Sequence, residues 1–221
     1  STLLAGGQVG STTSGLLRST DGGLTWTALT ATGLNGYDVY ALTGLTTTTA
    51  MLAGSDNGAG RVSLVNVSTL TVGDAFSPVT NVMALTSWGG TSHLAAGPNG
   101  RFGSNRPSGS WADYSVGDDA DLTDVLTDPQ GAGLLLFATG PAGVITKVSG
   151  NTVTLVQSPV TARLNAVARR AYMSYVAVGD SGTVVSTSGG TASTWFHVAS
   201  GLTTQRLNDV ACTSPTWCVA V

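Results

Sequence analysis

Short apolar runs alternate with glycine- and threonine-rich turns along the whole chain of 221 residues. Six of these runs resemble one another, and all but the last lead into a glycine turn: Leu3–Gly7, Met51–Gly54, His93–Gly97, Leu136–Gly140, Val176–Gly179 and Cys218–Val221. The glycines at 6, 54, 97, 140 and 179 are spaced by 48, 43, 43 and 39 residues. Short apolar runs bounded by turn residues are typical of β-strands, and a period of about 40 residues is that of a four-stranded propeller blade.

A second apolar pattern precedes each of these runs except the first. Its five copies are 38–42, 81–85, 122–126, 163–167 and 206–210, and their last residues are separated by 43, 41, 41 and 43 positions. So regular a spacing indicates structural repeats rather than unrelated strands. We assign this pattern to the innermost strand of each blade, strand a, and the run before the glycine turn to strand b.

The repeats predict an all-β fold, a five-bladed β-propeller of four-stranded antiparallel blades forming one domain over residues 1–221. The expected blades are 37–79, 80–120, 121–161, 162–204, and 205–221 together with 1–36. The alternative is a fragment of a six- or seven-bladed propeller, and the chain is either a mature secreted product or a piece of something longer.

One stretch has turn-favouring residues at all the positions that a tight turn requires: Ser19-Thr20-Asp21-Gly22-Gly23-Leu24-Thr25-Trp26. Ser and Asp side chains accept hydrogen bonds from nearby backbone N–H groups, and glycine allows a positive φ. The stretch resembles the Asp-box of the sialidase-like and photosystem-assembly-factor-like β-propellers, with Ser19, Asp21, Gly23, Thr25 and Trp26 as its motif residues. Degenerate copies end at Trp111 and Trp195. Because these tryptophans regularly follow a turn, we predict that they are packing anchors between blades rather than a sugar-stacking platform.

Composition narrows the function classes. All 12 acidic residues are Asp, and the 9 basic residues are Arg except for Lys147, which gives a net charge of −3. Such a chain has no basic field to hold nucleic acid, and helix formers are scarce, so we expect almost no helix. No apolar run is long enough to cross a bilayer. Sialidases that resemble this chain use a Tyr activated by Glu, and the chain has no Glu, so we expect no enzyme activity.

Two residue sets are candidates for binding. Charges at the strand a starts and the b–c turns would rim the central channel of a propeller and bind a small anionic or polyhydroxyl ligand: Asp38, Asp56, Arg101, Arg163, Asp180 and Arg206. Four aromatic residues in the a–b loops would form a contact face: Trp88, Tyr172, Tyr175 and Trp217. We favour solvated rim charges over a ligand site for the first set, since single surface charges are mostly not functional. Loop packing explains the second set about as well as a contact face does.

The sequence predicts no cofactor and no metal site. Asp118, Asp119, Asp121 and Asp124 have the spacing of oxygen ligands, but they lack the central Gly and terminal Glu of an EF-hand, so a solvated loop is the better interpretation. His93 and His197 are more than a hundred residues apart, which excludes a local zinc motif.

Cys212 and Cys218 flank a five-residue turn and should face each other across the a–b hairpin of the last repeat. A disulfide there implies an oxidising, extracellular or cell-surface location. The N-glycosylation sequon at Asn66 supports that location only weakly.

Three function classes remain open: a structural or adhesive extracellular module, a glycan-binding lectin or protein-partner scaffold, and, least favoured, a glycosidase. A closed five-bladed disc needs five b strands, and the sequence has six, with 3–7 and 218–221 competing for one place. Because exposed edge strands promote pairing with other chains, we expect the surplus strand to pair with another copy, which would build a head-to-tail fibre. The expected partners are therefore other copies of the chain or surface proteins and glycans.

Overall fold

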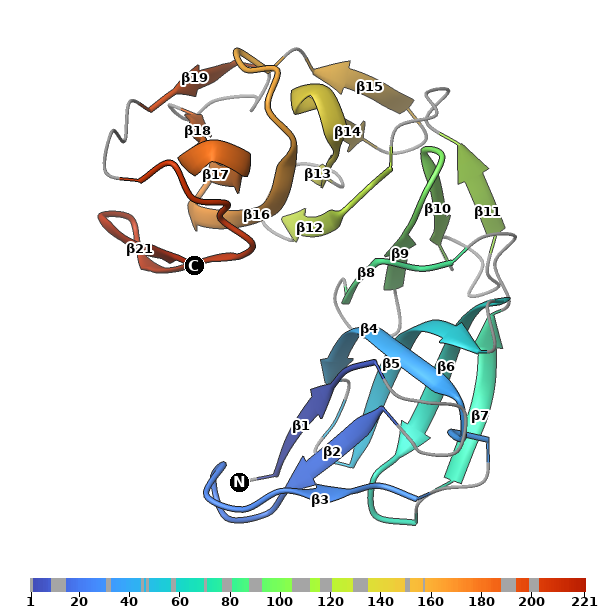
Figure 1. The fold of residues 1–221 in the computed structure, drawn as a ribbon. Coiled ribbons are helices and arrows are strands. Elements are labelled where there is room, and N and C mark those ends of the chain that lie inside the picture. The colour runs from blue at the N-terminus through green and yellow to red at the C-terminus, as the bar shows by residue number, and fades with distance from the viewer. Residues whose placement is uncertain are drawn as a thin grey trace. The chain divides into compact units, whose positions relative to one another are not determined.

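The computed structural model describes residues 2–8, 15–30, 33–44, 46, 48–56, 59–69, 71–76, 81–87, 93–104, 112–115, 121–128, 135–149, 152–156, 158–187, 194–198 and 203–221 (Figure 1). Within these residues the chain is made of β-strands and two short 3-10 turns, η1 (Pro141–Gly143) and η2 (Asp180–Gly182), with no α-helix. None of the described helices is long and apolar enough to cross a membrane. The all-β prediction is confirmed, in keeping with the abundance of Thr, Val and Gly.

The described strands form six antiparallel sheets in chain order. The first contains β1 (Leu3–Gly6), β2 (Leu16–Ser19) and β3 (Thr27–Ala28), and the second β4 (Tyr37–Gly44), β5 (Thr49–Asp56), β6 (Ala59–Asn66) and β7 (Thr71–Phe76). The third contains β8 (Ala84–Ser87), β9 (His93–Ala96), β10 (Arg101–Ser104) and β11 (Ala112–Ser115). The fourth contains β12 (Asp124–Asp128), β13 (Leu135–Thr139), β14 (Ile145–Ser149) and β15 (Thr152–Val156). The fifth contains β16 (Leu164–Ala171), β17 (Ser174–Gly179), β18 (Val184–Thr187) and β19 (Trp195–His197), and the sixth β20 (Val210–Ser214) and β21 (Trp217–Ala220).

Each of the four middle sheets has four strands in sequential order and falls within one predicted repeat. The first and last sheets have three and two described strands. Val39 donates its N–H to the Gly7 carbonyl, as Leu164 does to Gly140 and Leu207 to Gly179, which identifies β1 as a strand b. The described strands therefore include the two terminal b strands, β1 and β21, that the sequence indicated. The number of blades stays a prediction.

The chain divides into two compact units. The first comprises Ser1–Gly97 and Gly103–Tyr114, and the second comprises Pro98–Phe102 and Ser115–Val221. Within each unit, apolar side chains fill the space between consecutive sheets, as in the cluster of Leu16, Leu34, Tyr37 and Leu52 in the first unit. In the second unit, Ile145, Leu164, Tyr175 and Trp195 form the corresponding cluster. Sheet-on-sheet packing of this kind is the source of propeller stability, and the single-domain organisation stays a prediction.

The repeated glycine at the end of strand b has a steric explanation. A Cβ added to Gly54, Gly97 or Gly179 would lie 1.9–2.1 Å from a backbone oxygen at the start of strand a in the same sheet, on Asp38, Asn81 and Arg163 respectively. Real Cβ atoms do not approach oxygen so closely. Glycine therefore recurs at these three positions of the repeat because the backbones of strands a and b approach too closely there for a side chain.

The register of one strand a differs from the prediction. Val167 lies opposite Ala177, two residues before Gly179, whereas in the fourth sheet Val125 lies opposite Ala138, two residues before Gly140. The equivalent of Val167 is therefore Val125 and not Leu126. Both candidates are apolar, so the sequence pattern could not distinguish them, and pairing with β13 decides the register.

Candidate interaction surface

The turn from Ser19 to Trp26 forms the hydrogen-bond pattern that its sequence predicts. The Ser19 hydroxyl donates to Asp21 Oδ1 over 2.7 Å and accepts the N–H of Gly23 over 2.9 Å. Asp21 accepts the Thr25 N–H at Oδ1 (3.0 Å) and the Thr25 hydroxyl at Oδ2 (2.6 Å). These bonds, first of all that from the Thr25 hydroxyl, hold the pKa of Asp21 well below its usual range. Gly22 and Gly23 have φ values of 79° and 98°, which explains the glycine pair.

Trp26 is not the buried anchor that its position behind the turn predicted. It is 41% exposed, and its indole N–H donates to the Gly23 carbonyl over 3.0 Å, which closes the turn. Trp195 is buried in the second unit, as expected. Trp111 lies outside the described residues. Trp195 packs in a cluster with Ile145 and Val156 of the fourth sheet, whereas the Trp26 indole lies against the turn that precedes it.

Two of the predicted rim residues, Arg206 and Asp180, pair with each other. Arg206 Nε lies 3.3 Å from Asp180 Oδ1, and both side chains are largely solvent-accessible. Asn165 joins them, since its amide donates to Asp180 Oδ1 (3.0 Å) and to the Leu207 carbonyl (2.9 Å), and its oxygen accepts from Arg206 (3.3 Å). This arrangement neutralises the charge that an anionic ligand would need. The ligand rim as a whole stays a prediction.

The other rim candidates have local roles. Asp38 accepts a hydrogen bond from the Tyr40 hydroxyl; burial first and the Asp38 charge second raise the pKa of Tyr40. Arg163 lies half-buried before β16, and its carbonyl accepts the N–H of Asp180. Arg101 begins β10, and the side chain of Asp56 lies outside the described residues.

Of the four aromatic residues predicted to form a contact face, two are exposed. Tyr172 is 61% exposed and Trp217 is 58% exposed, at the a–b turns of the fifth and sixth sheets. Tyr175 is wholly buried in the core of the second unit, so its assignment to the contact face is wrong. Trp88 lies outside the described residues.

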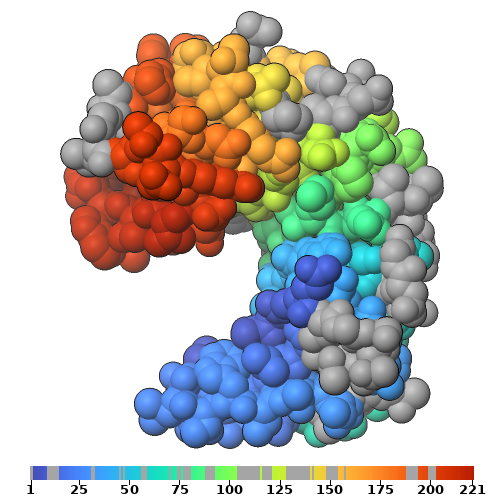
Figure 2. All heavy atoms as spheres, viewed as in Figure 1, coloured from blue at the N-terminus to red at the C-terminus, as the bar shows by residue number. Residues whose placement is uncertain are grey.

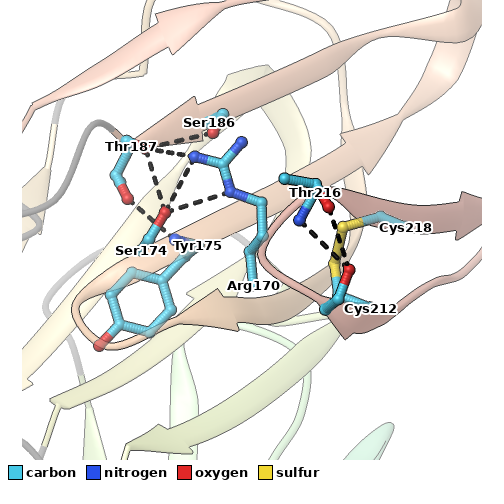
Figure 3. The surroundings of a disulfide bond; sticks show 9 residues. Arg170, Ser174, Tyr175, Ser186, Thr187, Cys212, Thr216 and Cys218 are labelled. Atoms are coloured by element: carbon cyan, nitrogen blue, oxygen red, sulfur yellow. Dashed lines mark hydrogen bonds between the residues drawn. A yellow bond between two sulfur atoms is a disulfide. The ribbon is translucent and has the colours of Figure 1, made fainter.

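The two aromatic turns belong to neighbouring strand pairs. Cys212 and Cys218 pack against the cluster formed by Ala166, Ala168, Val176 and Val178, so the β20–β21 hairpin covers β16 and β17. Figure 3 shows Arg170, at the end of β16, beside the disulfide-bonded hairpin. We name the pair of side chains Tyr172 and Trp217, with the turns that carry them, the aromatic turn surface.

Core packing and hydrogen bonds fix the turn that carries Tyr172. It has two residues, Tyr172 and Met173, and Met173 adopts a left-handed φ of 53° while its side chain packs against the core cluster around Trp195. A non-glycine residue keeps such a conformation only where its surroundings fix it. Arg170 donates to the Ser174 hydroxyl (3.0 Å), and the Thr187 hydroxyl accepts the Tyr175 N–H over 2.9 Å (Figure 3). Tyr172 is therefore presented on a rigid base.

The turn that carries Trp217 is closed by the predicted disulfide. Cys212 and Cys218 lie opposite each other in the β20–β21 pair, their sulfur atoms are bonded, and their Cα atoms are 4.0 Å apart. The Thr216 N–H donates to the Ser214 hydroxyl within the same turn. A disulfide is a feature of proteins from oxidising compartments.

Replacing both cysteines by serine is expected to lower the free energy of unfolding of the second unit by about 2 kcal/mol, because the open hairpin regains the loop entropy that the disulfide removes. Urea titrations of both proteins, followed by circular dichroism, measure the difference. Wild-type protein treated with a reductant should match the double variant. Equal urea midpoints for oxidised and reduced protein would show that the disulfide contributes nothing to the free energy of unfolding.

The carboxylate best suited to acid–base chemistry by its pKa has a structural position. Burial raises the pKa of Asp124 to about 6, and the charge of Asp209 adds to this. Both of its oxygens are occupied, Oδ1 by the Val125 N–H and Oδ2 by the Val167 N–H, each over 2.8 Å. Asp124 thus joins β12 to β16 of the next sheet. Asp124 therefore has a structural role within the second unit.

The remaining predicted site residues lie in separate environments. Asp121 accepts the N–H of Asn99, while Asp118 and Asp119 lie outside the described residues. No group of three metal-ligating side chains comes together within the part of the chain that the structure describes. Asn66 accepts the N–H groups of Ser68 and Thr69 in the turn after β6, and its glycosylation stays a prediction. Burial lowers the pKa of His93.

Comparison with known proteins shows likeness in structure alone. The sequence matches no protein-family model and no curated protein. A structure of YCF48 from Cyanidioschyzon merolae superposes with a TM-score of 0.70 at 13% identity, covering 93% of this chain and 70% of that one. A structure of YCF48 bound to D1 peptide also has a TM-score of 0.70, at 15% identity, with 93% of this chain and 67% of that one covered. The WD40 β-propeller domain of Doa1 gives 0.67 at 8% identity, covering 83% and 61%. The fold is therefore that of β-propeller proteins, and the chain spans 61–70% of the length of these three.

Proposed function

We propose that this chain is a non-catalytic β-propeller module that binds other proteins through the aromatic turn surface. One observation carries the proposal: Tyr172 and Trp217 are exposed on neighbouring turns, of which one is fixed by core packing of Met173 and the other by the disulfide. Large aromatic side chains on a rigid support give up little conformational entropy on binding, and they are enriched among the residues that contribute most to protein–protein affinity. Burial of two such side chains provides enough apolar area to anchor a partner.

The proposed setting is extracellular or at the cell surface, in a structural or adhesive role. The disulfide supports an oxidising compartment, because such bonds are rare in reducing cytosol. The peptide complex of the structurally similar YCF48 supports a protein partner, since it shows that one propeller of this shape binds a peptide. A lectin is the competing function, because aromatic side chains also stack on sugars. The absence of Glu and the structural position of Asp124 support a non-catalytic role.

Selection of a random phage-displayed peptide library on the purified chain, with a glycan array in parallel, tests this proposal. We expect enriched peptides whose affinity falls at least about tenfold in Tyr172→Ala and in Trp217→Ala, the loss of roughly 1.4 kcal/mol or more that is typical of aromatic anchors. Phe196→Ala is the matched control, because Phe196 is an equally exposed aromatic residue on β19, away from both turns.

Three results would contradict the proposal. Peptides that bind all three variants equally would place binding elsewhere on the chain. Glycans that bind and are lost in the same two variants would establish the lectin function instead. Turnover of sialosides or common glycosides that disappears on mutation of one Asp would refute the non-catalytic assignment.

A further inference from the structure

Arg170 is fixed beside the aromatic turn surface. Its Nη2 donates to the Ser174 hydroxyl over 3.0 Å and to the Thr187 carbonyl over 3.4 Å, and its Nε donates to the same hydroxyl over 3.3 Å (Figure 3). Ser174 and Thr187 are themselves buried, whereas the Arg170 side chain is half-buried. Nη1 has no hydrogen-bond acceptor among the described residues, and none of their carboxylates pairs with this guanidinium. Arg170 therefore keeps donors for a further acceptor in a fixed orientation.

Arg170 lies between the two turns that carry the exposed aromatic side chains. It is two residues before Tyr172, near the end of β16, and Figure 3 shows it between Ser174 and the disulfide-bonded hairpin, whose turn carries Trp217. The two hairpins pack on each other through a shared core cluster. In the space-filling view their strands, orange for β16–β17 and red for β20–β21, adjoin at the surface of the second unit (Figure 2). A partner that covers both aromatic side chains therefore also covers Arg170.

The charge of the chain is distributed unevenly. Residues 1–128 contain ten Asp and four Arg, whereas residues 129–221 contain five basic residues and only two acidic ones, Asp180 and Asp209. Asp180 follows the end of β17 that pairs with the start of β16, and Asp209 precedes β20. Arg170 is six residues further along β16, which is about 20 Å from that end. Within the fifth and sixth sheets, the aromatic turn surface thus has arginine but no acidic residue beside it, which favours an acidic partner.

We infer that the protein partner bound at the aromatic turn surface presents an Asp or Glu side chain, and that Arg170 binds its carboxylate. A guanidinium forms short, charge-assisted hydrogen bonds to a carboxylate, and less entropy is lost on binding when the donor is already ordered. The aromatic side chains supply apolar contact area, whereas Arg170 discriminates between partners by charge. This inference rests on the proposed function, since it names the chemistry of the partner that Tyr172 and Trp217 bind.

The random phage-displayed peptide library provides the first test. Sequences enriched on the wild-type chain should contain Asp or Glu more often than the unselected library, and the excess should vanish in a parallel selection on Arg170→Gln. Glutamine is neutral but can still donate to the Ser174 hydroxyl, so the turn keeps its support. Lys147→Gln is the matched control, because it removes one positive charge from β14 of the same unit, and it should leave the excess unchanged.

A double-mutant cycle separates recognition of charge from support of the turn. The most enriched peptide is synthesised together with variants in which each Asp or Glu is replaced by Asn or Gln. Arg170→Gln should weaken binding of the acidic peptide at least about tenfold and binding of one neutral variant less than about twofold, whereas loss of turn support would weaken both equally. Raising the NaCl concentration from about 0.05 M to about 0.5 M should weaken binding of the acidic peptide more than that of this neutral variant.

The outcomes distinguish this inference from the proposed function. Peptides that require Tyr172 and Trp217 but show no excess of acidic residues, or that bind Arg170→Gln as tightly as wild type, overturn the inference alone. A library from which no peptide is enriched contradicts both. Carboxylate-bearing glycans that bind on the array and are lost in Arg170→Gln would assign Arg170 to glycan recognition instead. If Arg170→Gln fails to fold by circular dichroism, the peptide variants and the salt dependence, measured on the wild-type chain, decide the question.

Discussion

Gly179→Ala is expected to lower the free energy of unfolding of the second unit by about 3 kcal/mol or more. The new Cβ would lie 1.9 Å from the Arg163 oxygen and 2.9 Å from its carbonyl carbon. That oxygen cannot withdraw freely, because it accepts the Asp180 N–H over 2.9 Å. Gly179 has extended backbone angles, so the loss comes from the close approach and not from conformational preference.

Urea unfolding followed by circular dichroism measures the effect, and Gly73→Ala is the matched control. Gly73 also lies in a strand, β7, but a Cβ there would meet nothing within 4 Å. Its replacement should leave stability unchanged or raise it by up to about 1 kcal/mol, because alanine restricts the unfolded chain. If Gly179→Ala behaved like Gly73→Ala, the steric explanation of the repeat period would be wrong.

Asp124→Ala is expected to destabilise the second unit by about 2–4 kcal/mol. The substitution leaves the N–H groups of Val125 and Val167 without the acceptor that each now has, and an unsatisfied buried donor costs about 1–3 kcal/mol. The link between β12 and β16 is lost at the same time. Asp209→Ala is the matched control, because Asp209 is exposed and accepts the N–H of the residue after it, Val210, as Asp124 accepts that of Val125; it should change stability little.

The same carboxyl group predicts a pH dependence. Its pKa of about 6 in the folded protein lies above the ordinary value of 3.8 for this carboxyl group, so the folded state binds a proton more tightly than the unfolded chain. The stabilising contribution is therefore fully present below pH 4 and is lost as the pH rises through 6, on the order of 1–2 kcal/mol between pH 4.5 and 7. Subtracting the profile of Asp124→Asn, which keeps the shape but cannot titrate, isolates this contribution. Parallel profiles for the two proteins would show that Asp124 does not titrate in this range.

The hydrogen bonds of the Ser19–Trp26 turn and the disulfide could be predicted from the sequence, because the groups that form them lie within a few residues of one another. Each hydrogen bond described above for the turn from Ser19 to Trp26 joins residues at most four positions apart. The Cys212–Cys218 bond spans one hairpin. The glycines at 54, 97 and 179 recur in the sequence because the same backbone contact recurs in their three sheets. A sequence read alone therefore determines the strands, their repeat and these turns.

Which side chains are buried and which charges pair depends on the neighbouring sheets, so only the tertiary structure could show these features. Tyr172 and Tyr175 are three residues apart in the same hairpin, yet one is exposed and the other buried, because the strand pleat turns Tyr175 toward the core beside Trp195. Asp124 finds its second donor, Val167, 43 residues away. Asp180 meets Arg206 from the next repeat, which cancels the charge that had suggested a ligand rim. These outcomes follow from which sheet packs on which, and no short stretch of sequence contains that information.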